Sequence, residues 1–312
     1  MVKKLRKLVS RLRSPLKEPL VLPEFSQSEM ELIQSVREDV RALGPVAVLD
    51  SMTDSEKEWT KNRIALRNLM LYSDLRLFLR WEMIRHTMFT TEASFTDAEI
   101  TYLKRIGKSI DDFQEDSVGS PDSLIFYPNT SGNLIHHEYH LSRFETEQDV
   151  ELAKLPFILE FGGGYGSLCR LIQRRNYAGT YVIYDLPEFS ILQKFFLKSI
   201  GVNVRTVEEF DEGRAGVYLV SEEPALKKIL ATKSKQSLLI GTWSLSETPV
   251  DFRKNFFEVA GSFSNYLLAY QDRFNEVDNV KYFDDFARAR PDVAFRTIRI
   301  SHLPGHAYLF GS

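Results

Sequence analysis

The chain has 312 residues, of which 43% are hydrophobic and 27% charged, values that are ordinary for a soluble globular protein with a substantial core. Its formal net charge of −3 provides no basic field and so gives no support for binding nucleic acid. The single cysteine, Cys169, excludes an intramolecular disulfide and fits a reducing compartment, which favours a cytoplasmic location. No apolar run approaches the roughly 18 residues that a membrane-spanning helix requires.

The first 13 residues, MVKKLRKLVSRLR, carry six basic side chains and no acidic one. If this segment is helical, Val2, Leu5, Val9 and Leu12 fall near one face, with the basic side chains beside them. Such a pattern allows weak peripheral contact with an anionic membrane at the inner face, whereas a solvated tail is the simpler interpretation.

The region that follows, up to about residue 150, shows mostly helical periodicity. A stretch rich in Pro, Gly, Ser and Asn at 119–132 is typical of a loop. The predicted helices run over about 28–43, from 53 or 54 through 88, and over about 97–106.

After Leu155 the pattern changes to short apolar runs that alternate with helical segments, which is typical of a mostly parallel α/β sheet. The segment 202–207 is ambiguous between a further strand and an excursion after a helix. The last two predicted strands are joined through a Leu-Pro-Gly turn without a helix, so we expect an antiparallel final strand. The predicted strands are 157–161, 181–184, 216–220, 238–242, 266–270, 295–300 and 307–310, and the predicted helices are 168–175, 187–199, 224–231, 249–262 and 280–290.

The segment 159–166 reads LEFGGGYG and lies where the first strand should turn into a helix. Its glycines permit a tight turn and close approach of the backbone to a ligand, and the helix N-terminus offers unpaired N–H groups. An acid two residues before the first glycine favours S-adenosylmethionine (SAM), which is positively charged at its sulfonium, over a negatively charged diphosphate. We therefore expect SAM as the cofactor of a Rossmann-like sheet, bound by Glu160, Gly162, Gly163, Gly164, Tyr165 and Gly166.

Two other interpretations of this turn stay open. An NAD(P)-dependent oxidoreductase or nucleotide-sugar enzyme could use a similar sheet, although Ser167 stands where the last glycine of Gly-x-Gly-x-x-Gly belongs. A non-catalytic, methyltransferase-like partner protein could retain the same fold, although the intact glycines and Asp185 argue against it.

Further cofactor contacts are expected where the next strands end. Asp185 follows the second strand about 20 residues beyond the turn, where an acid can accept hydrogen bonds from ribose hydroxyls, and Leu186 lies beside it. Ser221 and Glu222 follow the third strand, next to the expected position of the adenine. Thr242 ends the fourth strand and completes the predicted SAM site.

The motifs LEFGGGYGSL, YVIYDLPEF, LLIGTWSLSETP, YLLAYQDRF and ISHLPGHAYLFG resemble the bacterial sugar O-methyltransferase family. The resemblance covers roughly residues 134–312. It implies a SAM-dependent enzyme that transfers a methyl group to a hydroxyl of a sugar or surface-glycan precursor in polysaccharide biosynthesis, so the expected partner is a saccharide.

A sugar hydroxyl is a poor nucleophile until a base accepts its proton. Glu247, after the fourth strand, is one candidate for this base. The segment 134–143 supplies three more, because a helix would place His136 and His140 one turn apart with His137 beside them. The same spacing suits a divalent metal, but we favour a lid that closes on SAM and the sugar, without a metal.

The remaining candidates would bind the acceptor. Trp243 could stack on a ring, and Gln271 and Asp272, after the fifth strand, could bind hydroxyls. We divide the chain into a helical lid and acceptor-specificity region, 1–150, and a SAM-binding domain, 151–312. The predicted acceptor-binding residues are Arg143, Trp243, Ser246, Gln271 and Asp272, with His302 and His306 at the final turn as weaker candidates and His302 expected to lie outside the active face.

Overall fold

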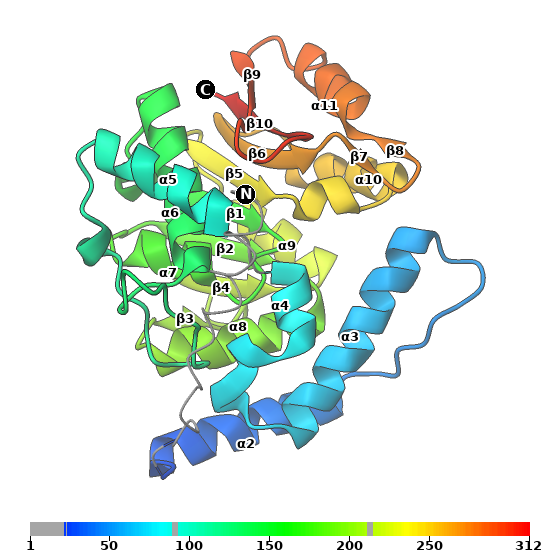
Figure 1. The fold of residues 1–312 in the computed structure, drawn as a ribbon. Helices are drawn as coiled ribbons and strands as arrows, with labels where there is room; N and C mark the ends of the chain where they lie inside the picture. Colours follow the sequence, from blue (N-terminus) through cyan, green and yellow to red (C-terminus); the bar gives the residue numbers. More distant parts are fainter. Residues whose placement is uncertain (1–21, 23, 89–92, 211–214) are drawn as a thin grey trace, which may run out of the picture.

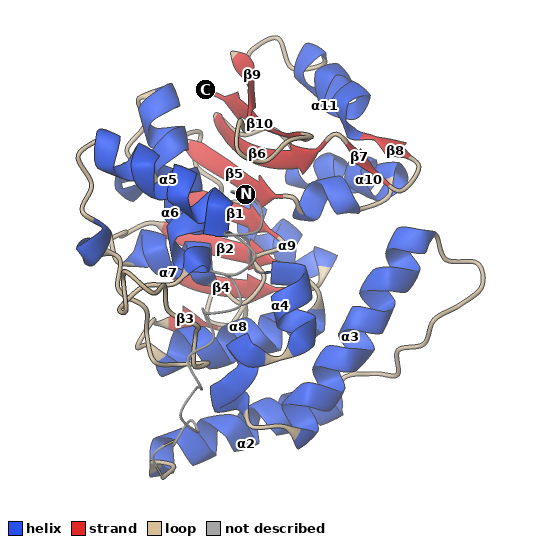
Figure 2. Ribbon diagram, in the orientation of Figure 1, coloured by secondary structure: helices blue, strands red, loops and turns tan. Residues whose placement is uncertain are grey.

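A computed structural model describes residues 22, 24–88, 93–210 and 215–312 of the chain. Figure 1 shows a central sheet with helices on both faces and a group of N-terminal helices at one side. Figure 2 separates the two kinds of element by colour. The mixture of a mostly parallel sheet with flanking helices confirms the predicted α/β class.

The central sheet has eight strands in the order β3-β4-β2-β1-β5-β6-β10-β9 within the described residues. All neighbours from β3 to β6 pair in parallel, whereas β10 runs antiparallel to both β6 and β9. The predicted antiparallel ending is therefore confirmed. The ambiguous segment 202–207 contributes a two-residue edge strand. The strands are β1 (Phe157–Phe161), β2 (Thr180–Tyr184), β3 (Val204–Arg205), β4 (Gly216–Val220), β5 (Ser237–Thr242), β6 (Asn265–Gln271), β9 (Phe295–Arg299) and β10 (His306–Gly311), and a separate ribbon pairs β7 (Arg273–Phe274) with β8 (Val277–Asp278).

Alternate residues of the strands enter two different cores, because successive side chains of a strand point to opposite faces. In β1, Ile158 packs into one core while Phe157, Leu159 and Phe161 pack into the other. Both faces of the central strands are covered, which explains why β1, β4, β5 and β6 are mostly apolar runs, whereas the edge strand β9 exposes Arg296, Thr297 and Arg299. Helices α6 (Gly132–Gln148), α7 (Ser167–Gln173) and α8 (Pro187–Ser199) cover the first face, and α9 (Glu223–Leu230), α10 (Val250–Ala260) and α11 (Asn279–Arg288) cover the second.

The N-terminal helices pack around the edge of the first core. Helix α2 lies on α8, where Lys194 and Asp39 form an ion pair of 2.6 Å, and α3 also packs on α8. Helix α6 packs against α5, α7 and β10, so it belongs to the body of the fold. These elements are α2 (Gln27–Ala42), α3 (Asp54–Tyr72), η1 (Leu75–Arg80), α4 (Glu82–Met88) and α5 (Ala93–Arg105), with the short turns η2 (Ile110–Asp112) and η3 (Leu152–Lys154).

The prediction of one continuous helix from residue 53 or 54 through 88 is wrong at its middle. Helix α3 begins after Thr53, whose side chain forms a capping box with Glu56, and it ends at Tyr72. Ser73 is extended, and the Asp74 carboxylate accepts a hydrogen bond from the backbone N–H of Arg76 at 3.0 Å. This local cap competes with helix continuation and starts the new turn η1.

Two expectations concern membranes and the N-terminus. Within the described residues, no helix combines the length and apolar character needed to cross a bilayer. The basic segment 1–13, for which we considered peripheral membrane contact, lies outside the described residues.

Candidate active site

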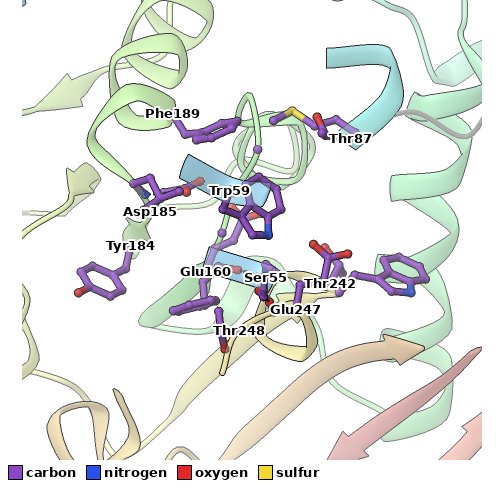
Figure 3. A pocket seen from close by; sticks show the side chains of 18 of the residues that line it. Ser55, Trp59, Thr87, Glu160, Tyr184, Asp185, Phe189, Thr242, Glu247 and Thr248 are labelled. Carbon is purple, nitrogen blue, oxygen red and sulfur yellow. Dashed lines mark hydrogen bonds between the residues drawn. The ribbon is translucent and has the colours of Figure 1, made fainter. Parts of the chain in front are cut away.

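A cavity of about 720 Å³ opens where the carboxyl ends of β1, β2, β4 and β5 meet helices α3, α4 and α6. The chain moves outward from β1 to one side of the sheet and later returns through β5 on the other side, so the strand order reverses at this point. Ligands of open α/β sheets bind at such a switch point. Figure 3 shows Glu160, Asp185 and Glu247 facing this cavity, with Trp59 of α3 reaching into the same space.

The glycine turn after β1 forms one wall of the cavity. Gly162 and Gly164 have φ of +71° and +57°, in the left-handed region that favours glycine. A Cβ at Gly162 would overlap the side chain of Ser244, and one at Gly163 would lie 2.6 Å from Cγ2 of Ile183. The turn therefore admits no side chain at these two positions.

Glu160 lies beneath this turn and is buried, yet it lines the cavity. Its Oε2 accepts a hydrogen bond from the Tyr181 hydroxyl at 2.7 Å. Burial, together with the negative charge of Asp185, raises the pKa of Glu160 to about 8, although the hydrogen bond from Tyr181 lowers it. The carboxyl is therefore largely protonated at neutral pH until a positive group comes close to it.

Asp185, after β2, also lines the cavity, as its sequence position predicts. Oδ1 accepts a hydrogen bond from the backbone N–H of Leu186 at 2.7 Å, and Oδ2 accepts one from Nε2 of Gln193 at 2.8 Å. Burial raises the pKa of Asp185 to about 7 in spite of these bonds. Gln193 also donates to the carbonyl oxygen of Gly164 at 2.9 Å, so it joins the acid to the glycine turn.

The other predicted cofactor residues divide into two groups. The group that lines the cavity includes Tyr165, whose hydroxyl accepts a hydrogen bond from Asn133 at 2.9 Å. Gly166 and Glu222 lie outside the cavity wall, at the N-cap positions of α7 and α9. The predicted cofactor residues in the wall are Glu160, Gly162, Gly163, Gly164, Tyr165, Asp185, Leu186, Ser221 and Thr242.

Glu247 lies in η4 (Ser244–Glu247) after β5, and it lines the cavity. Burial, with a smaller contribution from Glu58, raises the pKa of its carboxyl to about 7. The hydroxyl of Ser55 on α3 donates to the backbone carbonyl of Glu247, which ties the helix to this loop. The carboxyl itself has no hydrogen bond to any described residue, so it is available to a ligand.

Trp243 precedes this turn and has a φ of +63°, which is rare for a bulky residue and is typical of constrained functional sites. Its indole N–H donates to Nδ1 of His306 at 2.7 Å. Because that nitrogen accepts a hydrogen bond, the proton of the neutral His306 ring is on Nε2. Burial lowers the pKa of His306, which favours this neutral form. His306 lines the cavity and can donate to a ligand.

The three histidines of α6 occupy different positions. His136 lines the cavity, its ring stacks on Trp243 at a centroid distance of 5.6 Å, and its Nδ1 lies 2.5 Å from Oε1 of Glu99. His137 also lines the cavity, and burial lowers its pKa well below the ordinary value. His140 lies behind the wall, where its Nδ1 is hydrogen-bonded to the Tyr308 hydroxyl. Burial lowers the pKa of His140 as well, so this ring is neutral.

Among the predicted acceptor-binding residues, Trp243 and the weaker candidate His306 line the cavity, and the others do not. The Ser246 hydroxyl lies 2.6 Å from the carbonyl oxygen of Trp243 and 2.8 Å from Oε1 of Gln271, so this pair supports the Trp243 loop. Arg143 pairs with Glu147 at 2.9 Å, and Asp272 pairs with Arg299 at the surface. No group of three or more His, Cys, Asp or Glu side chains in the described part of the chain could hold a metal ion.

Helices α3 and α4 supply wall residues that sequence reasoning missed. Trp59 contacts Phe189 edge-on at a centroid distance of 5.8 Å, and Arg63 donates to the buried carboxylate of Glu188 at 2.7 Å. The periodicity of α3 predicts a helix but does not show which face meets the site. Others from these helices are Ser55, Glu56, Thr60, His86, Thr87 and Met88, and Met52 lines the cavity from the segment before α3.

No family model and no curated protein matches the chain. Similar solved structures include magnesium protoporphyrin IX methyltransferase from Synechocystis with bound SAM, which is 13% identical; the match covers 84% of this chain and 98% of that one, with a TM-score of 0.40. MtNAS in complex with SAM is 14% identical; the match covers 99% of this chain and 96% of that one, with a TM-score of 0.39. PigF with S-adenosylhomocysteine (SAH) is 14% identical; the match covers 91% of this chain and 95% of that one, with a TM-score of 0.36. These similarities are too distant to assign a substrate.

Proposed function

We propose that the protein is a SAM-dependent O-methyltransferase that acts on a hydroxyl of a sugar or surface-glycan precursor. The observation that carries this proposal is the composition of one cavity. A glycine turn without room for side chains, the buried carboxyl of Glu160 and the half-buried carboxyl of Asp185 line the same cavity as His136 and Glu247. When bound, SAM supplies a methyl group on a positive sulfur that is a good leaving group.

The two acids suit a positively charged cofactor. In the proposed complex Glu160 lies near the positive end of SAM, whose charge favours the ionised carboxylate, and Asp185 accepts hydrogen bonds from the ribose hydroxyls. A dinucleotide would bring its diphosphate to the same turn. Its negative charge would oppose ionisation of Glu160, so this acid favours SAM over NAD, whereas Asp185 suits the ribose of either cofactor.

The other side of the cavity suits an uncharged polyol. Trp243 offers an aromatic surface against which the apolar face of a sugar ring can pack. His306 donates through Nε2–H, and Glu247 accepts through its unpaired carboxyl. Together these groups can hold a sugar hydroxyl in line with the methyl group, which is the main task of an enzyme for this displacement.

Binding measurements by calorimetry test the cofactor, with SAM, S-adenosylhomocysteine and NAD as ligands for the full chain. We expect SAM and its product to bind and NAD not to bind. Binding of NAD alone would overturn the proposal. A screen of sugars and nucleotide sugars with labelled methyl donor then tests the acceptor, and transfer of label only to amines or carboxylates would contradict O-methylation.

A further inference from the structure

We propose that Glu99 is a positioning residue that makes His136 the general base of the reaction. The inference rests on the proposed function, because it names the proton acceptor for that same site. Glu99 was not a candidate on sequence grounds, and it is fully buried on α5 outside the cavity wall.

Glu99 connects three distant segments of the chain. Its Oε1 lies 2.5 Å from Nδ1 of His136 on α6 and 3.0 Å from Nε2 of His302, in the turn between β9 and β10. Burial raises the pKa of Glu99, but the two histidines outweigh burial and lower it overall. Glu99 is therefore an anion at neutral pH, and it accepts both hydrogen bonds.

This contact decides which nitrogen of His136 can act. Since an ionised carboxylate only accepts hydrogen bonds, Nδ1 of His136 carries the proton and Nε2 has the lone pair. Nε2 of His140 is fully buried and has no hydrogen-bond partner among the described residues. Nε2 of His136 also has no such partner, but it is not fully buried. Because His136 lies in the cavity wall and its Nδ1 is bonded to Glu99, Nε2 is the ring nitrogen left to accept the proton of the acceptor hydroxyl.

The surroundings of His136 hold its ring in place. Trp243 stacks on one side with an interplanar angle of 21°, and His140 contacts the ring at a centroid distance of 4.1 Å. His137 and His140 are neutral because they are buried, and burial also lowers the pKa of nearby His306. Glu99 is thus the anion paired with His136 when His136 gains a proton.

The proton transfer balances with methyl transfer. As the bond between the acceptor oxygen and the methyl carbon forms and the sulfur–methyl bond breaks, the hydroxyl proton passes to Nε2 of His136. The resulting imidazolium is stabilised by Glu99, as in other sites where a buried carboxylate orients a histidine base. Glu247 lacks such an orienting partner among the described residues, so we assign it to binding of the acceptor.

The test compares Glu99→Gln with His136→Gln and with Glu138→Gln as a matched control. Glu138 is a buried carboxylate on the same helix as His136, but it pairs with Lys108 and Arg175 at 2.6 Å, away from the cavity. Glu99→Gln should lower kcat about 100-fold and leave the Kd for SAM within about twofold. It should also move the rise of kcat/KM with pH to lower pH by about one unit, because the imidazolium loses its counter-charge. Glu138→Gln should not move this profile.

A second measurement does not depend on activity or on a stable variant. Nitrogen-15 chemical shifts of His136, assigned with His136→Gln, report its tautomer in the unaltered protein. We expect a proton on Nδ1; a proton on Nε2 would overturn the inference, as would an unmoved pH profile in Glu99→Gln. If the proposed function fails, SAM does not bind to the unaltered protein, whereas failure of the inference leaves SAM binding intact.

Discussion

Nε2 of Gln193 donates a hydrogen bond of 2.8 Å to Oδ2 of Asp185, and this contact orients the acid at the end of β2. The same amide nitrogen bonds to the carbonyl oxygen of Gly164. The glycine turn and the proposed ribose-binding acid, 21 positions apart in the chain, are thus held by one side chain of α8.

Replacement of Asp185 tests the ribose contact. Asp185→Ala should weaken SAM binding by about 1–3 kcal/mol, since it removes charge-assisted hydrogen bonds. Calorimetry provides the measurement. Glu222→Ala is the matched control. Glu222 is also an acid and follows β4, which lies beside β2 in the sheet, but it does not line the cavity. Equal SAM affinity in both variants would contradict the ribose role of Asp185.

A bulky residue in the glycine turn should abolish SAM binding. Gly164 has a φ of +57° and lines the cavity, and a Cβ there would lie 3.4 Å from Sδ of Met88, another lining residue. We expect Gly164→Val to lose detectable SAM binding by calorimetry. Gly201→Val imposes a similar backbone strain at φ +79° with no atom nearby, away from the cavity. Loss of binding in the Gly201 variant as well would show that strain, and not occupied space, is responsible.

Binding of SAM should release protons at neutral pH. The pKa of Glu160 is raised to about 8 and that of Asp185 to about 7, because desolvation disfavours their charged forms. A positive ligand favours their ionised forms, so protons leave on binding and SAM affinity should increase from about pH 6 to about pH 8. Calorimetry in buffers of different ionisation enthalpy counts these protons. Glu160→Gln should release fewer, and an unchanged count would exclude Glu160 as the source.

The same two acids predict how stability depends on pH without a ligand. Their folded pKa values exceed the ordinary values of 4.5 and 3.8, so the folded state binds more protons than the unfolded state between about pH 4 and 8. The free energy of unfolding should therefore decrease as pH increases through this range. Thermal denaturation with and without SAM measures this, and the Tm increase caused by SAM should be larger at pH 8 than at pH 6. An equal Tm increase at both values would contradict this coupling.

Glu247 should affect acceptor binding more than turnover. Glu247→Gln removes an unpaired carboxyl that we assign to a sugar hydroxyl, so KM for the acceptor should increase about tenfold while kcat changes little. Steady-state kinetics at saturating SAM separates the two quantities. A large loss of kcat with an unchanged KM would instead identify Glu247 as the base.

The sequence alone determined seven strands of the central sheet, the glycine turn and the position of Asp185, because these depend on neighbours within a few residues; it left β3 ambiguous and missed β7 and β8. Periodicity, glycines and strand ends are local signals, and parallel strands bring their carboxyl ends together in any such sheet. The tertiary structure decided which helical side chains meet the cavity. Glu99 reaches His136 from 37 positions away and His302 from 203, and α3 supplies Trp59 and Arg63. Such contacts depend on how whole helices pack, and helical periodicity shows an apolar face without naming the partner of that face.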